Sequence, residues 1–329
     1  MTAGGGWAPA DAHLEGDALA MRAALRMSSN RAAVRMIEDV GVPAAVQYAE
    51  RFGMPGMPQV PSVALGSGEV TMLSLVSAFG AFANEGKLVP PSLVRRVTSS
   101  SGQVLYESEA TAQAVVRPAT AYLITSMLED VVNAGTGAQV RRLGFNLPAA
   151  GKTGTTNDYR DAWFIGYTPT LVTGVWVGYD QPRMIMQGGY AAQLAVPLWT
   201  RFMMTVTRGA APDRFRAPAS VTTATICPLS GKLATDACAR DNEASVYTEY
   251  FERGTEPTDY CPYHTLRSRA PLTLASAVAP APDARPEGTA ATPAPASASS
   301  PAAQASEPAA PDSPPDKKKR GFWARIFGR

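Results

Sequence analysis

The residue types best suited to chemistry occur together in one short stretch, Gly151-Lys152-Thr153-Gly154-Thr155-Thr156. Lys152 supplies a positive charge without a metal ion. Thr153 and Thr155 are two residues apart, so on a β-strand their hydroxyls face the same side. Gly154 lies between them and allows a ligand backbone to approach closely, and an extended peptide could pair with the edge of such a strand. The stretch therefore suits a peptide ligand with a carboxylate, the alternative being a plain Lys-Thr-Gly turn.

A second polar group occurs much earlier in the chain, at Ser28-Ser29-Asn30. It lies between two segments of helical character, residues 19–27 and 32–40. A serine and an asparagine two residues apart, at a break between helices, can both point into one cleft. Serine and asparagine also cap helices for structural reasons, so this group alone decides nothing about function.

The elements that would position these residues can be predicted from local patterns. Residues 162–167 and 171–179 are aromatic and β-branched and are separated by Thr168-Pro169-Thr170, which predicts a hairpin. Lys152 is expected on an adjacent strand that opens onto a cleft. A second hairpin is predicted within residues 92–107. Apolar spacing and end signals predict helices over residues 17–27, 31–39, 44–52, 71–84, 117–132 and 190–205.

The helix over residues 71–84 illustrates how the core was predicted. Leu73, Val76, Phe79 and Phe82 fall near one stripe of this helix, and such a stripe is typical of a core-facing surface. The loop Asn133-Ala134-Gly135-Thr136-Gly137 ends the next long helix. The family resemblance described below implies that this loop borders the ligand cleft, and the alternative is a plain helix stop with a glycine.

Composition excludes some broad classes of protein. The formal net charge of the 329 residues is only +2, so no global field favours nucleic acid as a partner. The hydrophobic share of 45% is sufficient for a real core, at least up to about residue 210. No run of about twenty apolar residues occurs, and no signal peptide begins the sequence.

Taken together and in this order, the two polar groups resemble the Ser-x-Asn and Lys-Thr-Gly motifs of penicillin-binding proteins and class A β-lactamases. The resemblance extends collinearly over residues 7–210 to the C-terminal part of the transpeptidase domain of a class A (bifunctional, 1A-type) penicillin-binding protein. The segments that carry it are residues 24–35, 64–72, 81–86 and 151–180. It implies an α+β, β-lactamase/transpeptidase-like fold, an antiparallel sheet flanked by helices.

One element of the family pattern does not occur in this sequence. The family nucleophile is the serine of Ser-x-x-Lys, upstream of Ser-x-Asn, yet none of the six lysines is preceded by serine at the third position. We therefore expect an N-terminally truncated domain with no nucleophile in this chain. The membrane anchor and the glycosyltransferase domain of the family also lie N-terminal to the region that matches.

The resemblance implies a peptidoglycan D,D-transpeptidase of cell-wall cross-linking, at the extracytoplasmic face of the membrane, with stem peptides and β-lactams as ligands and no cofactor. Ser28, Asn30 and Lys152 would be the catalytic residues. Thr153, Gly154, Thr155 and Thr156 would bind the substrate carboxylate. Two alternatives are a noncatalytic cell-wall binding or scaffold protein and a β-lactamase relative. The strand-rich insert at 87–117 and the cysteine-containing extension favour the penicillin-binding protein over the β-lactamase.

The remaining sequence divides into three further parts after residues 1–210. Residues 211–268 form a small extension with Cys227, Cys238, Cys261 and the pair Cys261-x-x-His264. A disulfide with one spare thiol is the favoured interpretation, and a Cys₃His zinc site is the alternative, although its spacing matches no standard finger, so no metal site is predicted. Residues 269–316, rich in Ala, Pro, Ser and Thr, are expected to be a disordered linker.

The last part, residues 317–329, places basic side chains beside Phe322, Trp323, Ile326 and Phe327. Such a segment suits contact with an anionic membrane or another polyanion. The alternative is a charged end that contributes only solubility.

Overall fold

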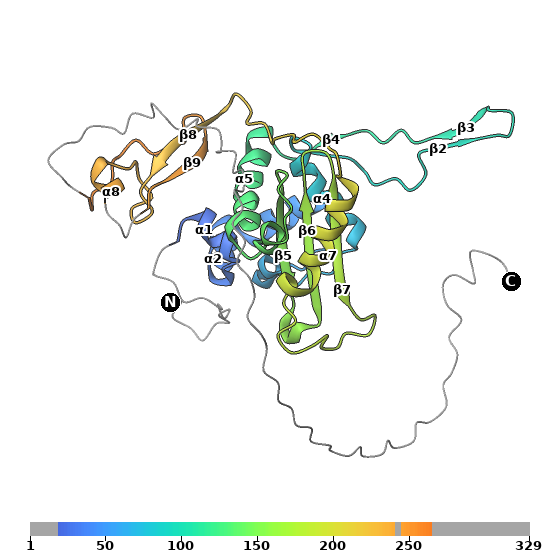
Figure 1. The fold of residues 1–329 in the computed structure, drawn as a ribbon, viewed down its shortest axis with the longest axis horizontal. Helices are drawn as coiled ribbons and strands as arrows, with labels where there is room; N and C mark the ends of the chain where they lie inside the picture. Colours follow the sequence, from blue (N-terminus) through green and yellow to red (C-terminus); the bar gives the residue numbers. More distant parts are fainter. Residues whose placement is uncertain (1–18, 241–244, 265–329) are drawn as a thin grey trace, which may run out of the picture. The chain divides into compact units, whose positions relative to one another are not determined.

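Three antiparallel strands form the sheet that carries the Lys-Thr-Gly stretch (Figure 1). We describe a computed structural model, in which residues 19–240 and 245–264 are described. The strands, in spatial order, are β5 (Ala150–Thr155), β6 (Asp161–Tyr167) and β7 (Val172–Gly178). The predicted hairpin is β6–β7, with Trp163 opposite Trp176, and Lys152 pairs with Ile165 on the adjacent strand as expected.

Helices cover both faces of this sheet, because its strands are apolar on both sides. Alternate residues of β6 point to opposite faces. Phe164 packs edge-on against Trp199 of α7 (Ala191–Val206), whereas Tyr167 packs against Phe79 of α4 (Met72–Ala83). α5 (Pro118–Ala134) joins α4 on that second face, where its buried Val131 contributes to the same core as Tyr167. The sheet between helices is the predicted α+β arrangement.

The region before the sheet is helical and contains short turns at the predicted breaks. Its elements are α1 (Met21–Met27), α2 (Asn30–Val40), α3 (Val42–Arg51) and the 3₁₀ turn η1 (Pro61–Leu65). Gly41, between α2 and α3, has φ of 90°, a conformation that favours glycine, and Pro43 lies in the first turn of α3. The predicted helix starting at residue 17 begins outside the described residues.

The predicted core stripe of α4 is correct only in part. Thr71 caps the helix by accepting a hydrogen bond from the Ser74 N–H, and the helix buries Ala78 and Ala81. Leu73, however, is 49% exposed. A spacing of three residues falls about 60° short of a full turn at each step, so Leu73 and Phe82 point to opposite sides. The apolar residues of this helix therefore do not share one face.

Four short strands form the insert between α4 and α5. They are β1 (Lys87–Leu88), β2 (Arg96–Thr98), β3 (Val104–Glu107) and β4 (Gln113–Ala114). β2 and β3 form the hairpin expected within residues 92–107, and β1 pairs with β4 at its base. Both strands of the hairpin are exposed along their length, so the hairpin contributes little to the core.

The C-terminal extension contains a two-stranded sheet that sequence analysis did not predict. It consists of β8 (Val221–Ile226) and β9 (Tyr247–Glu252), with the short helix α8 (Asp236–Arg240) between them. Tyr250 of β9 packs on Tyr122 of α5, and Glu249 of β9 forms an ion pair with the buried Arg22 of α1. The extension is thereby attached to the two helices nearest to it.

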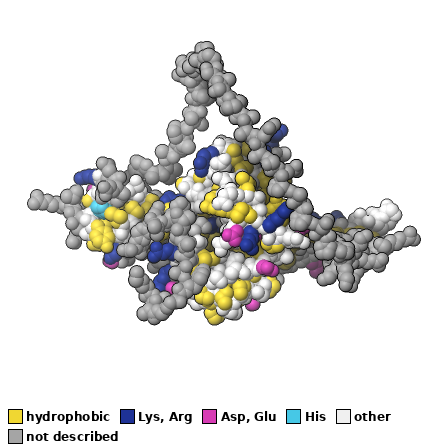
Figure 2. Space-filling view, turned by 90° about the horizontal axis from the view of Figure 1, so that it is seen from below, with side chains coloured by type: hydrophobic (Ala, Val, Ile, Leu, Met, Phe, Trp, Pro, Cys, Tyr) yellow, Lys and Arg dark blue, Asp and Glu magenta, His cyan; other side chains and the backbone are white. Residues whose placement is uncertain are grey.

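The described surface is mixed in character. In the view of Figure 2, basic and acidic side chains are interspersed among apolar and neutral ones. Within residues 19–240 and 245–264, we find no helix long and apolar enough to cross a membrane. The predicted linker at 269–316 and the basic segment at 317–329 lie outside the described residues.

Candidate functional site

The two polar groups singled out in the sequence meet in the structure. Lys152 lies on the edge strand β5, and its Nζ donates a hydrogen bond of 2.7 Å to the Ser28 Oγ. A second bond of 2.9 Å runs from the same Nζ to the Thr153 carbonyl oxygen. Two groups separated by 124 positions in the chain are therefore in direct contact. Local patterns could not give this distance.

Ser28 has an unusual backbone conformation. Ser28 ends α1 in the left-handed conformation, with φ of 61° and ψ of 46°. A non-glycine residue in this region costs roughly 1–2 kcal/mol, and such strain occurs often at functional sites. Ser29 has the structural role, because its Oγ caps α2 by accepting from the Ala32 N–H at 3.3 Å. Asn30 is the first residue of α2.

The amine of Lys152 has an unusual electrostatic environment for a lysine. Burial lowers its pKa from the ordinary value to about 8. The residue as a whole keeps partial exposure, so the side chain is shielded but faces an accessible region. A lysine with a pKa near neutrality can hold or release a proton during a reaction.

The glycine loop after α5 borders the site, which favours the first of its two predicted interpretations. A Cβ added at Gly135 would lie 2.4 Å from the Arg26 carbonyl oxygen, so this position requires glycine. The Thr136 N–H donates to that same carbonyl at 3.2 Å. The Thr136 hydroxyl lies 2.6 Å from the Thr153 hydroxyl. Thr136 belongs to the loop that the sequence analysis singled out, but it was not among the predicted site residues.

Thr155 of β5 and Thr156, which follows the strand, make hydroxyl contacts of their own. Thr155 Oγ1 accepts a bond of 3.1 Å from the Ala191 N–H, at the first residue of α7. Thr156 Oγ1 donates to the Asp161 carboxylate at 3.1 Å and accepts from the Asp161 N–H at 2.8 Å. The common side predicted for Thr153 and Thr155 from their spacing stays a prediction.

Gly154 lies between the two threonines, and the strand is open at one edge. β5 pairs with β6 along one side, and within the described residues no strand pairs with its other side. An extended peptide could add to that edge through main-chain hydrogen bonds. A cation, several hydroxyls and a free strand edge are together suited to a peptide that ends in a carboxylate.

The fold and these contacts define the class of protein. An antiparallel sheet between helices, with a lysine of its edge strand bonded to a serine at a helix break, is a transpeptidase-like domain. The chain belongs to the penicillin-binding protein transpeptidase family, since the model of the "penicillin binding protein transpeptidase domain" matches residues 2–198. A second model, "Penicillin-binding protein 1A, C-terminal domain", matches residues 217–266. Together they confirm the class A, 1A-type resemblance.

Relatives of known name agree with the two family models. The chain is 36% identical over 213 residues to penicillin-binding protein 1A of Neisseria flavescens, covering 62% of this chain and 26% of the relative. It is 34% identical over 241 residues to penicillin-binding protein 1A of Aquifex aeolicus, covering 73% and 32%. The chain thus spans about a quarter to a third of the length of these relatives.

Solved structures show the same fold. A crystal structure of penicillin-binding protein 1A from Haemophilus influenzae matches 74% of this chain and 41% of that one, with a TM-score of 0.68 and 25% identity. PonA1 from Mycobacterium tuberculosis in complex with penicillin V matches 60% of this chain and 59% of that one, with a TM-score of 0.53 and 28% identity. The predicted fold class is thereby confirmed.

Proposed function

We propose that residues 1–210 provide the Ser-x-Asn and Lys-Thr-Gly half of a peptidoglycan D,D-transpeptidase site that acts in cell-wall cross-linking. The observation that carries this proposal is the 2.7 Å bond from Lys152 Nζ to Ser28 Oγ. It brings together the two motifs of the family and does so at the open edge of β5. The proposed ligands are stem peptides and β-lactams.

The proposed reaction is an acyl transfer through a serine. The serine oxygen forms a bond to the carbonyl carbon of D-Ala–D-Ala, the C–N bond breaks, and the serine proton passes to the leaving D-Ala amine. An amine of a second stem peptide then takes the acyl group and restores the serine. A penicillin would acylate the same serine. The family places this serine in Ser-x-x-Lys, a pattern that the 329 residues do not contain.

The roles that we assign follow the resemblance to the family. Ser28 would relay the proton to the leaving amine, and Lys152 would hold Ser28 and supply positive charge. Asn30 would bind an amide of the donor peptide. The hydroxyls of Thr153, Thr155 and Thr156, beside Gly154, would receive the terminal carboxylate. The Thr155 N–H would be one oxyanion donor, and such a donor is worth about 3 kcal/mol to the transition state.

A fluorescent penicillin tests this assignment. The 329-residue chain alone should give no labelled band on a denaturing gel, because it lacks the activated serine. An extended form, in which the Ser-x-x-Lys segment of a relative is fused to its N-terminus, should be labelled. Labelling of the chain alone would overturn the assigned division of roles. Failure of a folded extended form to label would overturn the enzymatic proposal itself.

A second candidate is a noncatalytic cell-wall binding or scaffold protein built on this domain, which would need no Ser-x-x-Lys pattern. The nucleotide sequence upstream of Met1 separates the two candidates. An in-frame Ser-x-x-Lys there supports the enzyme, whereas a stop codon supports the scaffold. We further propose an extracytoplasmic location at the membrane, as the family resemblance implies.

A further inference from the structure

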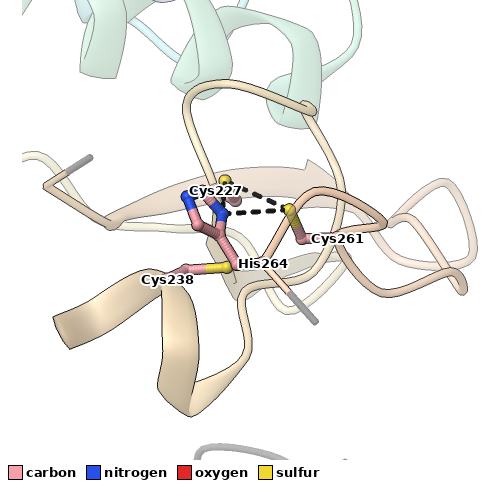
Figure 3. Close-up of side chains that lie close together, drawn as sticks. All are labelled: Cys227, Cys238, Cys261 and His264. Atoms are coloured by element: carbon pink, nitrogen blue, oxygen red, sulfur yellow. Dashed lines mark hydrogen bonds between the residues drawn. The ribbon is translucent and has the colours of Figure 1, made fainter. Parts of the chain in front are cut away.

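The three cysteines of the chain and His264 form one cluster in the C-terminal extension (Figure 3). Cys227 follows β8, Cys238 lies in α8, and Cys261 and His264 follow β9. Their four potential ligand atoms, three sulfurs and one imidazole nitrogen, all lie within 4.8 Å of one another. The cluster therefore collects side chains from separate segments at one point.

The spacing of these atoms does not correspond to a disulfide. All three cysteines are described, and all three are free thiols. The Cys227 and Cys261 sulfurs are 3.5 Å apart, whereas a disulfide bond is about 2.05 Å long. The disulfide favoured from the sequence is therefore not formed. That prediction depended on the expected oxidising compartment, and the sequence gives no distances between the sulfurs.

The Cys227, Cys261 and His264 atoms are spaced like three corners of a tetrahedral zinc site, and the Cys238 sulfur lies within 4.8 Å of them. With Zn–S of about 2.3 Å and Zn–N of about 2.0 Å, ligand atoms on a tetrahedron lie about 3.5–3.8 Å apart. His264 Nδ1 is 3.5 Å from the Cys227 sulfur and 3.3 Å from the Cys261 sulfur. These separations leave room for one ion at the centre of the cluster.

The groups around the ligands hold them in place. The Thr235 N–H donates to the Cys238 sulfur at 3.3 Å, which favours the thiolate over the thiol. The Thr235 hydroxyl also donates to the His264 carbonyl at 3.2 Å and so ties two of the ligating residues together. Backbone bonds from Cys227 N to Lys232 O and from Cys261 N to Leu233 O fix the two loops. Such outer contacts are typical of built metal sites.

The hydrophobic core of the extension is too small to stabilise its fold without further links. Its buried cluster consists of the three cysteines and Ala234, with Val246 packed against it. Outside this cluster, Ile226 of β8 is the one large aliphatic side chain that is fully buried in the described part of the extension. Small domains with so little core usually require a metal or disulfides. A bound ion would link β8, α8 and the segment after β9 and would replace the missing core.

We propose that Cys227, Cys238, Cys261 and His264 bind one structural Zn²⁺ ion. Three sulfurs and one imidazole exclude Mg²⁺ and Ca²⁺, which prefer oxygen ligands, and Cys₃His is a known ligand set for structural zinc. All four positions of the tetrahedron are filled by the protein, so the ion has no open position for catalysis. Binding converts three thiols to thiolates, and their protons are released to solvent.

The full 329-residue chain, purified without chelator after growth with zinc, provides the test. We expect about one zinc ion per chain by elemental analysis, together with three alkylatable thiols after denaturation. Cobalt titration of the metal-free chain should give an intense tetrahedral visible spectrum with sulfur-to-cobalt charge transfer. This measurement uses the unaltered chain and does not depend on a variant that folds.

Variants of the two histidines provide a matched pair. His264→Ala should lose at least tenfold in zinc affinity, His264→Cys should retain the metal, and His13→Ala, at the only other histidine, should leave binding unchanged. Zinc-free protein with one alkylatable thiol would overturn the proposal in favour of a disulfide. Equal loss of zinc in His13→Ala and His264→Ala, or a cobalt spectrum without sulfur ligation, would also overturn it.

Discussion

The sheet region with the Lys-Thr-Gly strand and the C-terminal extension hold their polar side chains in opposite ways. Around β5–β7, fully buried Trp199 and Phe164 form a core on one face of the sheet and Tyr167 belongs to a core on the other face, and the Lys152–Ser28 pair lies at the edge strand. In the extension, the buried cluster consists of the cysteines themselves and Ala234. In the first region a large hydrophobic core positions the polar residues. In the second region the cysteine cluster itself holds the fold together.

This difference predicts opposite responses to substitution. Removing a polar side chain from the rim of a large core should change chemistry and leave the fold intact. Removing a ligand from the small extension should unfold that extension and leave the sheet intact. Arg22 of α1 connects the two regions, because it forms ion pairs with Asp130 of α5 and with Glu249 of β9.

The largest expected effect is that of metal removal from the extension. Structural zinc in small domains contributes about 10 kcal/mol or more, which is folding free energy. Chelation should therefore abolish hydrogen-exchange protection in β8 and β9 while protection in β5, β6 and β7 persists. Mass spectrometry of peptides from both regions measures this in a single experiment. Equal loss of protection in both regions would show that the extension is not an independent structural unit.

Lys152→Ala should have the next largest effect and should affect chemistry alone. In the extended form with the Ser-x-x-Lys segment, we expect penicillin acylation to slow by about 100–1000-fold, as for loss of an essential polar group. The melting temperature should stay near that of the parent, because Lys152 lies at the rim of the core. Lys232→Ala is the control, since among the described residues this lysine forms its ion pair with the exposed Asp259, away from β5. Acylation within a few-fold of the parent would refute the role of Lys152.

Part of this comparison could be predicted from the sequence, and the reason is physical. The β6–β7 hairpin, α5 and α7 follow local patterns, and Lys-Thr-Gly and Ser-x-Asn are short contiguous motifs. The cysteine cluster depends on loops that come together only after β8 pairs with β9, so its spacing along the chain carries little information. The same limit applies to Thr136, whose contact with Thr153 is made through tertiary packing.

Leu73 shows a different limit. Its spacing with Phe79 and Phe82 predicts a place in the core, but three-residue steps drift by about 60° each and put Leu73 on the side opposite Phe82. The structure leaves Leu73 largely exposed and buries the small Ala78 and Ala81. Small residues are buried where helices approach closely, and a pattern of large apolar residues does not predict their burial.

The free energy of unfolding should depend on pH through Glu129 of α5, which lies near the border between the two regions. Burial raises the pKa of Glu129 to about 7, with Asp130 also raising it and Arg141 and Arg22 opposing. The native state therefore binds this proton more tightly than the unfolded state. The resulting stability is present below about pH 4.5 and is lost as pH rises through about 7.

Glu129→Gln should remove this pH dependence, because the amide stays neutral. We expect the variant to match the parent near pH 4.5 and to exceed its unfolding free energy at pH 8 by up to about 3 kcal/mol. Denaturant unfolding at a series of pH values measures the difference. Glu69→Gln, at an exposed position, should leave the pH profile unchanged. If the unfolding free energies of Glu129→Gln and the parent differed by the same amount at every pH, Glu129 would not be the source of the pH dependence.

The smallest effect is expected at Thr155, where one hydroxyl serves both the fold and the site. Its Oγ1 accepts from the Ala191 N–H, one of the N-terminal donors of α7 that have no partner within the helix. Thr155→Val removes this acceptor, and leaving a buried N–H unpaired costs about 1–3 kcal/mol. In the extended form, acylation should fall only a few-fold, because the Thr155 N–H remains as oxyanion donor. Thr155→Ser keeps the hydroxyl and should behave as the parent in both assays. If Thr155→Val slowed acylation as much as Lys152→Ala while its melting temperature stayed unchanged, the hydroxyl would serve the ligand alone, and the rim of this core would contain two equally essential groups.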